Sequence, residues 1–217
     1  MPSTNKPAMD SRTIDAFKSK LVGGGARPNL FEVELQWPSF LTGLDDDVQE
    51  MARFMVKAAN LPASNITPID VPFRGRNLKI AGDRTFDVWT ITIINDTDFK
   101  LRNAFEIWMN GMNKHQDATG VTTPTDYQRD AYVYQLGRSS SDGSADFGAT
   151  GGTIPVLKAY KFHGVFPTNV SAIELSYDQP DTIEEFTVDL QVQWWDAFNK
   201  DGETILGTEG EGIANAG

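Results

Sequence analysis

The stretch that decides the fold is "NLKIAGDRTFDVWTITIIND", residues Asn77–Asp96. Its second half alternates between apolar and polar residues, which is the pattern of a strand with one buried side. Gly82-Asp83 suits a tight turn with positive backbone φ. We therefore predict a hairpin in which Val71–Ile80 pairs with Thr85–Ile94, and the quoted stretch supplies its second arm.

Composition limits the classes of protein that the chain can represent. It has 217 residues with 40% hydrophobic content, enough for one domain with long insertions and tails. Thirty acidic residues against nineteen basic ones give a net charge of −11, which argues against tight binding of nucleic acid through neutralisation of its phosphates. The absence of cysteine excludes disulfides, thiolate metal sites and thiol nucleophiles.

The hydrophobic residues are distributed as in a soluble protein. The N-terminus lacks the apolar run of a signal peptide, and no stretch approaches the roughly 20 apolar residues of a membrane helix. We expect a soluble product, made in the cytoplasm, with no membrane partner.

Further strands are predicted wherever apolar residues recur at every second position. In the segment Leu30–Trp37, Phe31, Val33, Leu35 and Trp37 alternate with acidic and amide residues. The other predicted strands are Ala131–Leu136 paired with Val156–His163, and a second hairpin of Ser171–Tyr177 with Ile183–Trp195.

Helical spacing of apolar residues appears in fewer places. A short helix is predicted over Thr13–Leu21, and Arg53–Asn60 fits a strand or a short helix. A longer helix is predicted over Asp98–Met112, with Thr97 as N-cap and Gly111 marking its end. Its apolar stripe comprises Leu101, Phe105, Trp108, Met109 and Met112. Many strands and one good helix predict a mainly β fold, a two-sheet β-sandwich or barrel with one flanking α-helix.

No pattern in the chain indicates catalysis. His115 and His163 lie far apart without a metal-ligand spacing, and Asp45-Asp46-Asp47 lacks the glycine and terminal glutamate of a calcium loop. Glu185 and Asp189 share one side of a strand but lie about 13 Å apart by strand rise, too far for a glycosidase pair. We therefore predict no catalytic residue, no cofactor and no metal ion. The alternative from a different functional class is a carbohydrate-binding β-sandwich or a glycosidase. It is supported by the aromatic residues and by carboxylates that form no recognisable pair.

Three blocks of sequence resemble one known family. They are "ARPNLFEVEL" (Ala26–Leu35), "LPASNITPIDVPFRGRNLKIAGDRTFDVWTITIIND" (Leu61–Asp96) and "GVFPTNVSAIELSYDQPDTIEEFTVDLQVQWW" (Gly164–Trp195). Three motifs are specific in combination: the Arg-Pro-Asn-Leu-Phe start, and the Ala-Gly-Asp-Arg-Thr-Phe and Phe-Pro-Thr-Asn-Val segments, which are interpreted as turns. The chain resembles the tail tube proteins of contractile-tailed bacteriophages.

The resemblance implies an architecture and an assembly. Residues 26–196 would form the tail tube β-barrel domain with insertions at about 38–60 and 137–152, preceded by an N-terminal arm with a short helix at 1–25. Residues 197–217 would be a flexible acidic tail. Each subunit would contribute strands to a shared barrel in a hexameric ring, which removes exposed strand edges. Stacked rings would form a structural conduit in the virion, assembled in the host cytoplasm.

Three groups of residues are candidates for roles in that assembly. The strand that completes the shared ring would carry Thr85, Asp87, Trp89, Ile91 and Ile93. The acidic face with Glu185, Asp189, Gln191 and Gln193 would either line the channel, where it would repel DNA phosphates in transit, or face the sheath. Contacts between stacked rings would use the N-terminal arm and the loop with Asp45, Asp46 and Asp47.

The resemblance also implies partners. They are further copies of the chain, the tail sheath protein, the baseplate hub or tube initiator, the tail terminator, a tape measure protein in the lumen, and DNA in transient non-specific passage. An inner tube of a phage-related injection particle, of the bacteriocin or secretion type, is the nearer alternative.

Overall fold

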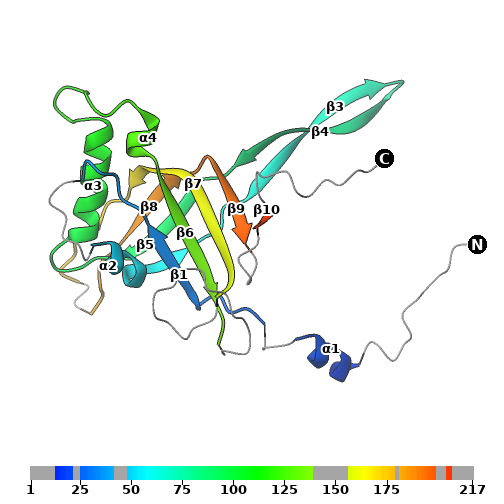
Figure 1. The fold of residues 1–217 in the computed structure, drawn as a ribbon, viewed down its shortest axis with the longest axis horizontal. Helices are drawn as coiled ribbons and strands as arrows, with labels where there is room; N and C mark the ends of the chain where they lie inside the picture. Colours follow the sequence, from blue (N-terminus) through cyan, green and yellow to red (C-terminus); the bar gives the residue numbers. More distant parts are fainter. Residues whose placement is uncertain are drawn as a thin grey trace, which may run out of the picture.

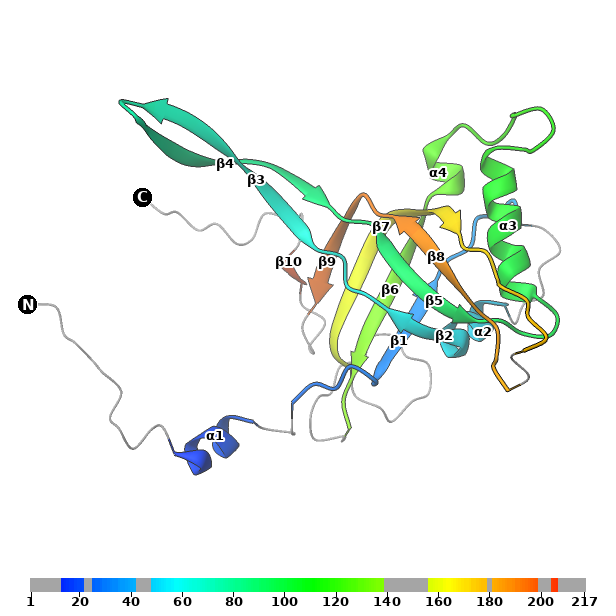
Figure 2. The ribbon, with the colours of Figure 1, turned by 180° about the vertical axis from the view of Figure 1, so that it is seen from behind.

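The computed structural model describes residues 13–21, 25–41, 48–138, 156–178, 181–198 and 204–206. The described chain is mainly β, as predicted. Figure 1 shows a barrel-like body of twisted strands, with helix α3 over one end and a long hairpin projecting from the other. Figure 2 shows the same arrangement from behind.

The body is one antiparallel sheet whose strands follow the order β1-β6-β7-β8-β5-β2. Strand β9 pairs with β7, and β10 pairs with β9. The predicted pairing of 131–136 with 156–163 is confirmed in β6 and β7. The strands are β1 Phe31–Leu35, β2 Val56–Ala59, β5 Trp89–Ile94, β6 Arg129–Leu136, β7 Val156–Val170, β8 Glu185–Gln191, β9 Trp194–Phe198 and β10 Thr204–Leu206.

Strand β7 bends at Gly164, and the parts before and after the bend pair with different strands. Before the bend it pairs with β9, and after it with β8. Gly164 has φ of 62°, and a Cβ there would lie 2.6 Å from Gln193 Cγ, so the bend requires glycine. The predicted hairpin of 171–177 with 183–195 is therefore wrong. The partner of β8 is the end of β7, and the supposed Phe-Pro-Thr-Asn-Val turn is strand.

A single long hairpin runs from β2 to β5. Its outer part consists of β3 (Ser64–Phe73) and β4 (Arg76–Phe86), joined by Arg74-Gly75 with φ of 47° and 81°. The predicted turn at Gly82-Asp83 is wrong, although 77–96 does form the second arm. Gly82 lies inside β4 at a register shift, where a Cβ would come within 2.4 Å of the Thr67 carbonyl oxygen. Gly82 is therefore part of a β-bulge and not of a turn.

Two of the helices in the described chain, α4 (Pro124–Tyr127) and most of α2 (Val48–Met55), lie where no helix was predicted. Helices α2, α4 and α1 (Ile14–Lys20) are short, and 53–60 contains both the end of α2 and β2. Helix α3 (Lys100–Met112) begins after Phe99, whose φ is 56°, and Asp96 Oδ2 accepts from the Lys100 amide. Thr97 as N-cap is therefore wrong. Gly111 is the last residue but one of α3, and it is glycine because a Cβ there would meet the Phe40 ring.

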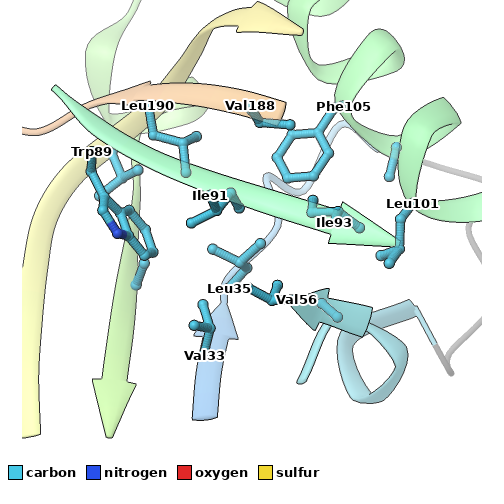
Figure 3. Close-up of a cluster of buried hydrophobic side chains, with 14 of the residues drawn as sticks. Val33, Leu35, Val56, Trp89, Ile91, Ile93, Leu101, Phe105, Val188 and Leu190 are labelled. Carbon is cyan, nitrogen blue, oxygen red and sulfur yellow. The ribbon is translucent and has the colours of Figure 1, made fainter. Parts of the chain in front are cut away.

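The core fills the barrel between β5, β8 and α3. Trp89 stacks on Phe162 with ring centroids 4.6 Å apart. Figure 3 shows Phe105 and Leu101 of α3 beside the end of β5, where they close the barrel. The predicted stripe of α3 thus covers an end of the sheet, and its buried members include Leu101, Phe105 and Trp108.

The alternation of β5 yields a stability prediction. Ile91 is fully buried, whereas Thr92 lies on the outer side opposite Thr187. Ile91→Ala should lower the free energy of unfolding by ~2–5 kcal/mol because it leaves a cavity. Thr92→Ala should cost less than about 1 kcal/mol. Urea denaturation of the unassembled protein measures both, and equal losses would contradict the assignment of faces.

Candidate assembly surfaces

The outer part of the long hairpin, residues 64–86, stands clear of the body and is called the projecting hairpin below (Figures 1 and 2). Nearly every residue of β3 and β4 is exposed. Its base is anchored to the rest of the described chain: the Phe86 ring lies 6.4 Å from the Trp195 ring, and Asn65 Nδ2 donates to Asp87 Oδ1 at 2.9 Å. Beyond that base, the two strands are held by their own pairing.

One side of the projecting hairpin is apolar. The register places Ile69 opposite Ile80, Val71 opposite Leu78 and Phe73 opposite Arg76. Directly opposite residues of antiparallel strands share a side, so these side chains form one continuous surface, called the apolar face. Phe73 is 65% exposed and Leu78 61%, which means that the described chain leaves this surface in water. The other side, called the polar side, carries Asn77 and the Asp70–Lys79 ion pair at 3.2 Å, together with Pro68, Pro72 and Ala81.

A second group of apolar side chains is exposed at the opposite end of the body. Leu175, Tyr177 and Ile183 lie in the loop between β7 and β8, and Phe54 lies on α2. Both views place this loop beside α2, away from the projecting hairpin. Helix α1 also exposes its apolar residues, Ile14 and Phe17.

The outer side of β2, β5 and β8 is polar and is called the polar face. Thr90 Oγ1 donates to Asp189 Oδ1 at 2.7 Å, and Asn169 Nδ2 donates to Asp189 Oδ2 at 3.0 Å. Hydrogen bonds from Asn169 and then Thr90 lower the pKa of Asp189, so its carboxylate stays ionised near neutral pH. The polar members of this face are Lys57, Thr90, Thr92, Asn169, Glu185, Thr187, Asp189 and Gln191. Ala58, opposite Thr92, and Ile94, opposite Glu185, lie on the same side.

The residues predicted to line a channel lie in two places. Glu185, Asp189 and Gln191 belong to the polar face, since they alternate with the buried residues of β8. Glu185 forms an ion pair with Lys57, so this face is less acidic than the sequence suggested. Gln193 lies beyond the end of β8, at the corner opposite Gly164.

The residues predicted to pair with another subunit need correction. Trp89, Ile91 and Ile93 are buried, and their strand β5 is paired on both edges, with β2 and β8. A strand with no free edge cannot extend a sheet into a neighbour. Thr85 belongs to β4, and Asp87 lies between β4 and β5. Strands β1 and β2 end the path of the sheet, and in the described chain each pairs with one strand only. Sequence analysis missed the two further free edges of the projecting hairpin, whose signal was the two-residue Arg74-Gly75 loop between alternating segments.

The remaining residues singled out from the sequence include the three aspartates at 45–47 and His163. Asp45, Asp46 and Asp47 lie outside the described residues. His163 Nε2 lies 2.9 Å from Asp196 Oδ2, and its ring stacks on Trp194. Among the described residues, no cluster of His, Asp and Glu could hold a metal ion, and no helix is long and apolar enough to cross a membrane.

Comparison with known proteins identifies the family. The family profile described as "Phage tail tube protein" matches residues 26–197. The tail tube protein gp19 of Enterobacteria phage T4 is 32% identical over 182 residues, covering 83% of this chain and 95% of that protein. The tail tube protein of Serratia phage KSP90 is 26% identical and covers 82% of this chain and 93% of its own.

Solved structures share the fold at low sequence identity. A chain of the six-fold symmetrised baseplate of the anti-feeding prophage superposes with a TM-score of 0.54 at 9% identity, covering 81% of this chain and 96% of that chain. A chain of the sheath/tube terminator of the PVC extracellular contractile injection system gives 0.52 at 10% identity, covering 80% and 96%. Profile and sequence together establish that the chain belongs to the phage tail tube protein family, whose members are structural components of the virion and not enzymes.

Proposed function

We propose that copies of this chain join through the projecting hairpin into rings that stack as a hollow tail tube, with the polar face lining the channel. The observation that carries this proposal is the uncovered apolar face. A two-stranded hairpin packed on nothing is marginally stable in water. Burying each large apolar side chain would contribute ~1.5–3 kcal/mol, enough for such a surface to drive association.

The arrangement of exposed apolar groups supports a head-to-tail contact. The apolar face lies at one end of the subunit, whereas Phe54, Leu175 and Tyr177 lie at the other. Different surfaces that complement each other on copies of one chain give rings or open-ended filaments instead of closed dimers. A tube requires both ring closure and stacking.

The polar face suits the wall of a water-filled channel. None of the large hydrophobic residues exposed in the described chain lies on β2, β5 or β8. Threonine hydroxyls and an ionised Asp189 offer a wettable surface without a cluster of positive charge, so DNA phosphates would find no strong binding site. The proposed cargo is a genome in transient passage.

The proposal extends to the assembly as a whole. Six copies would form each ring, and the other proposed contacts are the tail sheath, the baseplate hub or tube initiator, the terminator and a tape measure protein within the lumen. A phage tail is favoured over an injection particle because the 32% identical relative is a phage protein, whereas the injection-system chains share only 9–10% identity.

The first test adds one negative charge to either side of the projecting hairpin. Leu78→Asp places the charge in the apolar face and should keep the protein monomeric at concentrations where the unmodified chain forms sedimentable tubes. Asn77→Asp, one residue away on the polar side, should assemble normally. Sedimentation and negative-stain microscopy measure assembly. Loss of tubes in both variants, or in neither, would count against the apolar face.

The second test reverses charge in the proposed channel. Glu185→Lys combined with Asp189→Lys should leave tubes intact but slow DNA ejection, most strongly at low salt, because lysines would attract phosphates. Glu106→Lys on α3 is the control, since Glu106 is also paired with a basic neighbour, Arg102. Ejection measured by DNA release should be unchanged in the control. Unaltered ejection in the double variant would refute the channel assignment.

A further inference from the structure

The two edges of the projecting hairpin differ in their content of proline. Strand β3 contains Pro68 and Pro72, whereas β4 contains none over 76–86. Proline has no amide hydrogen, so it cannot donate to a neighbouring strand. The effect of each proline therefore depends on which way its backbone nitrogen points.

The hydrogen bonds at the base of the hairpin fix that direction. The Asp87 amide donates to the Ala63 carbonyl at 3.1 Å, so residue 63 points its backbone groups towards the opposite strand. Backbone groups alternate sides along a strand, which directs the odd-numbered residues of β3 towards β4 and the even-numbered ones outwards. Pro68 and Pro72 thus point outwards, as does Asp70 between them. Ser64, Ile66 and Asp70 keep an amide hydrogen at this edge, but in the outer part of the strand, from residue 68 to 72, Asp70 alone does so.

The outer edge of β4 is intact. The register pairs the odd-numbered residues 69, 71 and 73 of β3 with 80, 78 and 76 of β4, and the bulge at Gly82 absorbs the change of parity. Asn77, Lys79 and Ala81 therefore point outwards, each with both an amide hydrogen and a carbonyl. This edge can extend a β-ladder, whereas the edge of β3 cannot do so without losing two hydrogen bonds.

Charge points to another copy of this chain as the partner. The projecting hairpin carries four basic residues, Arg74, Arg76, Lys79 and Arg84, against Asp70 and Asp83, in a chain whose net charge is −11. A basic arm on a strongly acidic body is attracted to the body of its neighbour.

We infer that the projecting hairpin pairs with a second copy of this chain through the backbone edge of β4, and that Pro68 and Pro72 close the edge of β3. The inference rests on the proposed function, since it assigns a direction to the same contact. The hairpin would then add to a neighbour on one side only, which gives each ring or stack a defined polarity.

Residues 70 and 79 provide a matched pair of variants. They lie directly opposite each other, form one ion pair together and both point their amides outwards. Lys79→Pro removes a donor from the edge of β4, whereas Asp70→Pro removes one from the edge already blocked. Both variants lose the same ion pair. Lys79→Pro should raise the critical concentration for tube formation by about tenfold or more, and Asp70→Pro by less than about twofold.

A measurement on the unmodified protein avoids dependence on the folding of the variants. In assembled tubes, amide hydrogen exchange should slow strongly at Asn77, Lys79 and Ala81 and stay fast at Asp70. Equal protection of both edges, an equal loss of assembly in both variants, or a loss with Asp70→Pro alone would overturn the inference. Failure of the unmodified chain to assemble under any condition would instead refute the proposed function.

Discussion

Two strands that pack on no core are the constraint on which this protein's behaviour depends. Residues 64–86 have one hydrogen-bonded ladder and an apolar face in water. The hairpin of a free subunit is therefore only marginally stable. The net charge of −11 on every copy opposes the association of subunits. Burial of the apolar face favours assembly, while charge repulsion holds dispersed subunits apart. Assembly is then most favourable where an existing ring already presents the complementary surface.

The hairpin can project because its base belongs to the most enclosed part of the barrel. Strand β4 continues through Asp87-Val88 into β5, which is paired on both edges and carries the fully buried Trp89 and Ile91. The other side of β5 presents Thr90 and Thr92 to the polar face. The same arm thus holds the core, supports the proposed channel wall and carries the proposed intersubunit edge, so distortion of one would be transmitted to the others.

Alternation in the sequence predicted the parts of the fold where one side of an element is buried in its own subunit. Strands β1, β6 and β8 and the stripe of α3 are of this kind. The turn of the long hairpin was misplaced because Gly82-Asp83 is a stronger local signal than Arg74-Gly75, yet Gly82 is needed where the Thr67 carbonyl approaches. The course of β7 was missed because the Phe-Pro-Thr-Asn-Val segment, which contains Pro167, was interpreted as a turn although it is strand. A glycine or proline in the sequence indicates an irregular backbone, but it does not show whether that irregularity is a turn, a β-bulge or a bend within a strand.

The candidate interface was harder to predict for a different reason. Ile69, Val71 and Phe73 alternate as in any core strand, and sequence does not distinguish burial within a subunit from burial against a neighbour. Trp89, Ile91 and Ile93 alternate with polar residues in the same way, but these three side chains are buried in their own subunit. The hydrophobic pattern alone therefore predicts the strands of the barrel but does not identify the apolar face that the subunit leaves uncovered.

Charge also determines which symmetry the free edge can adopt. Two copies of β4 could in principle pair with each other about a two-fold axis and stop at a dimer. Such pairing would bring Arg76, Lys79 and Arg84 of both copies together across one ladder, and like charges facing each other between strands are destabilising. Pairing of β3 with β3 would bring the outward prolines of both copies into the ladder, where they cannot donate hydrogen bonds. Contact between the basic hairpin and the acidic body of another copy avoids both penalties. Because that contact uses different surfaces on the two partners, it leaves each new subunit with an unused hairpin, and growth can continue.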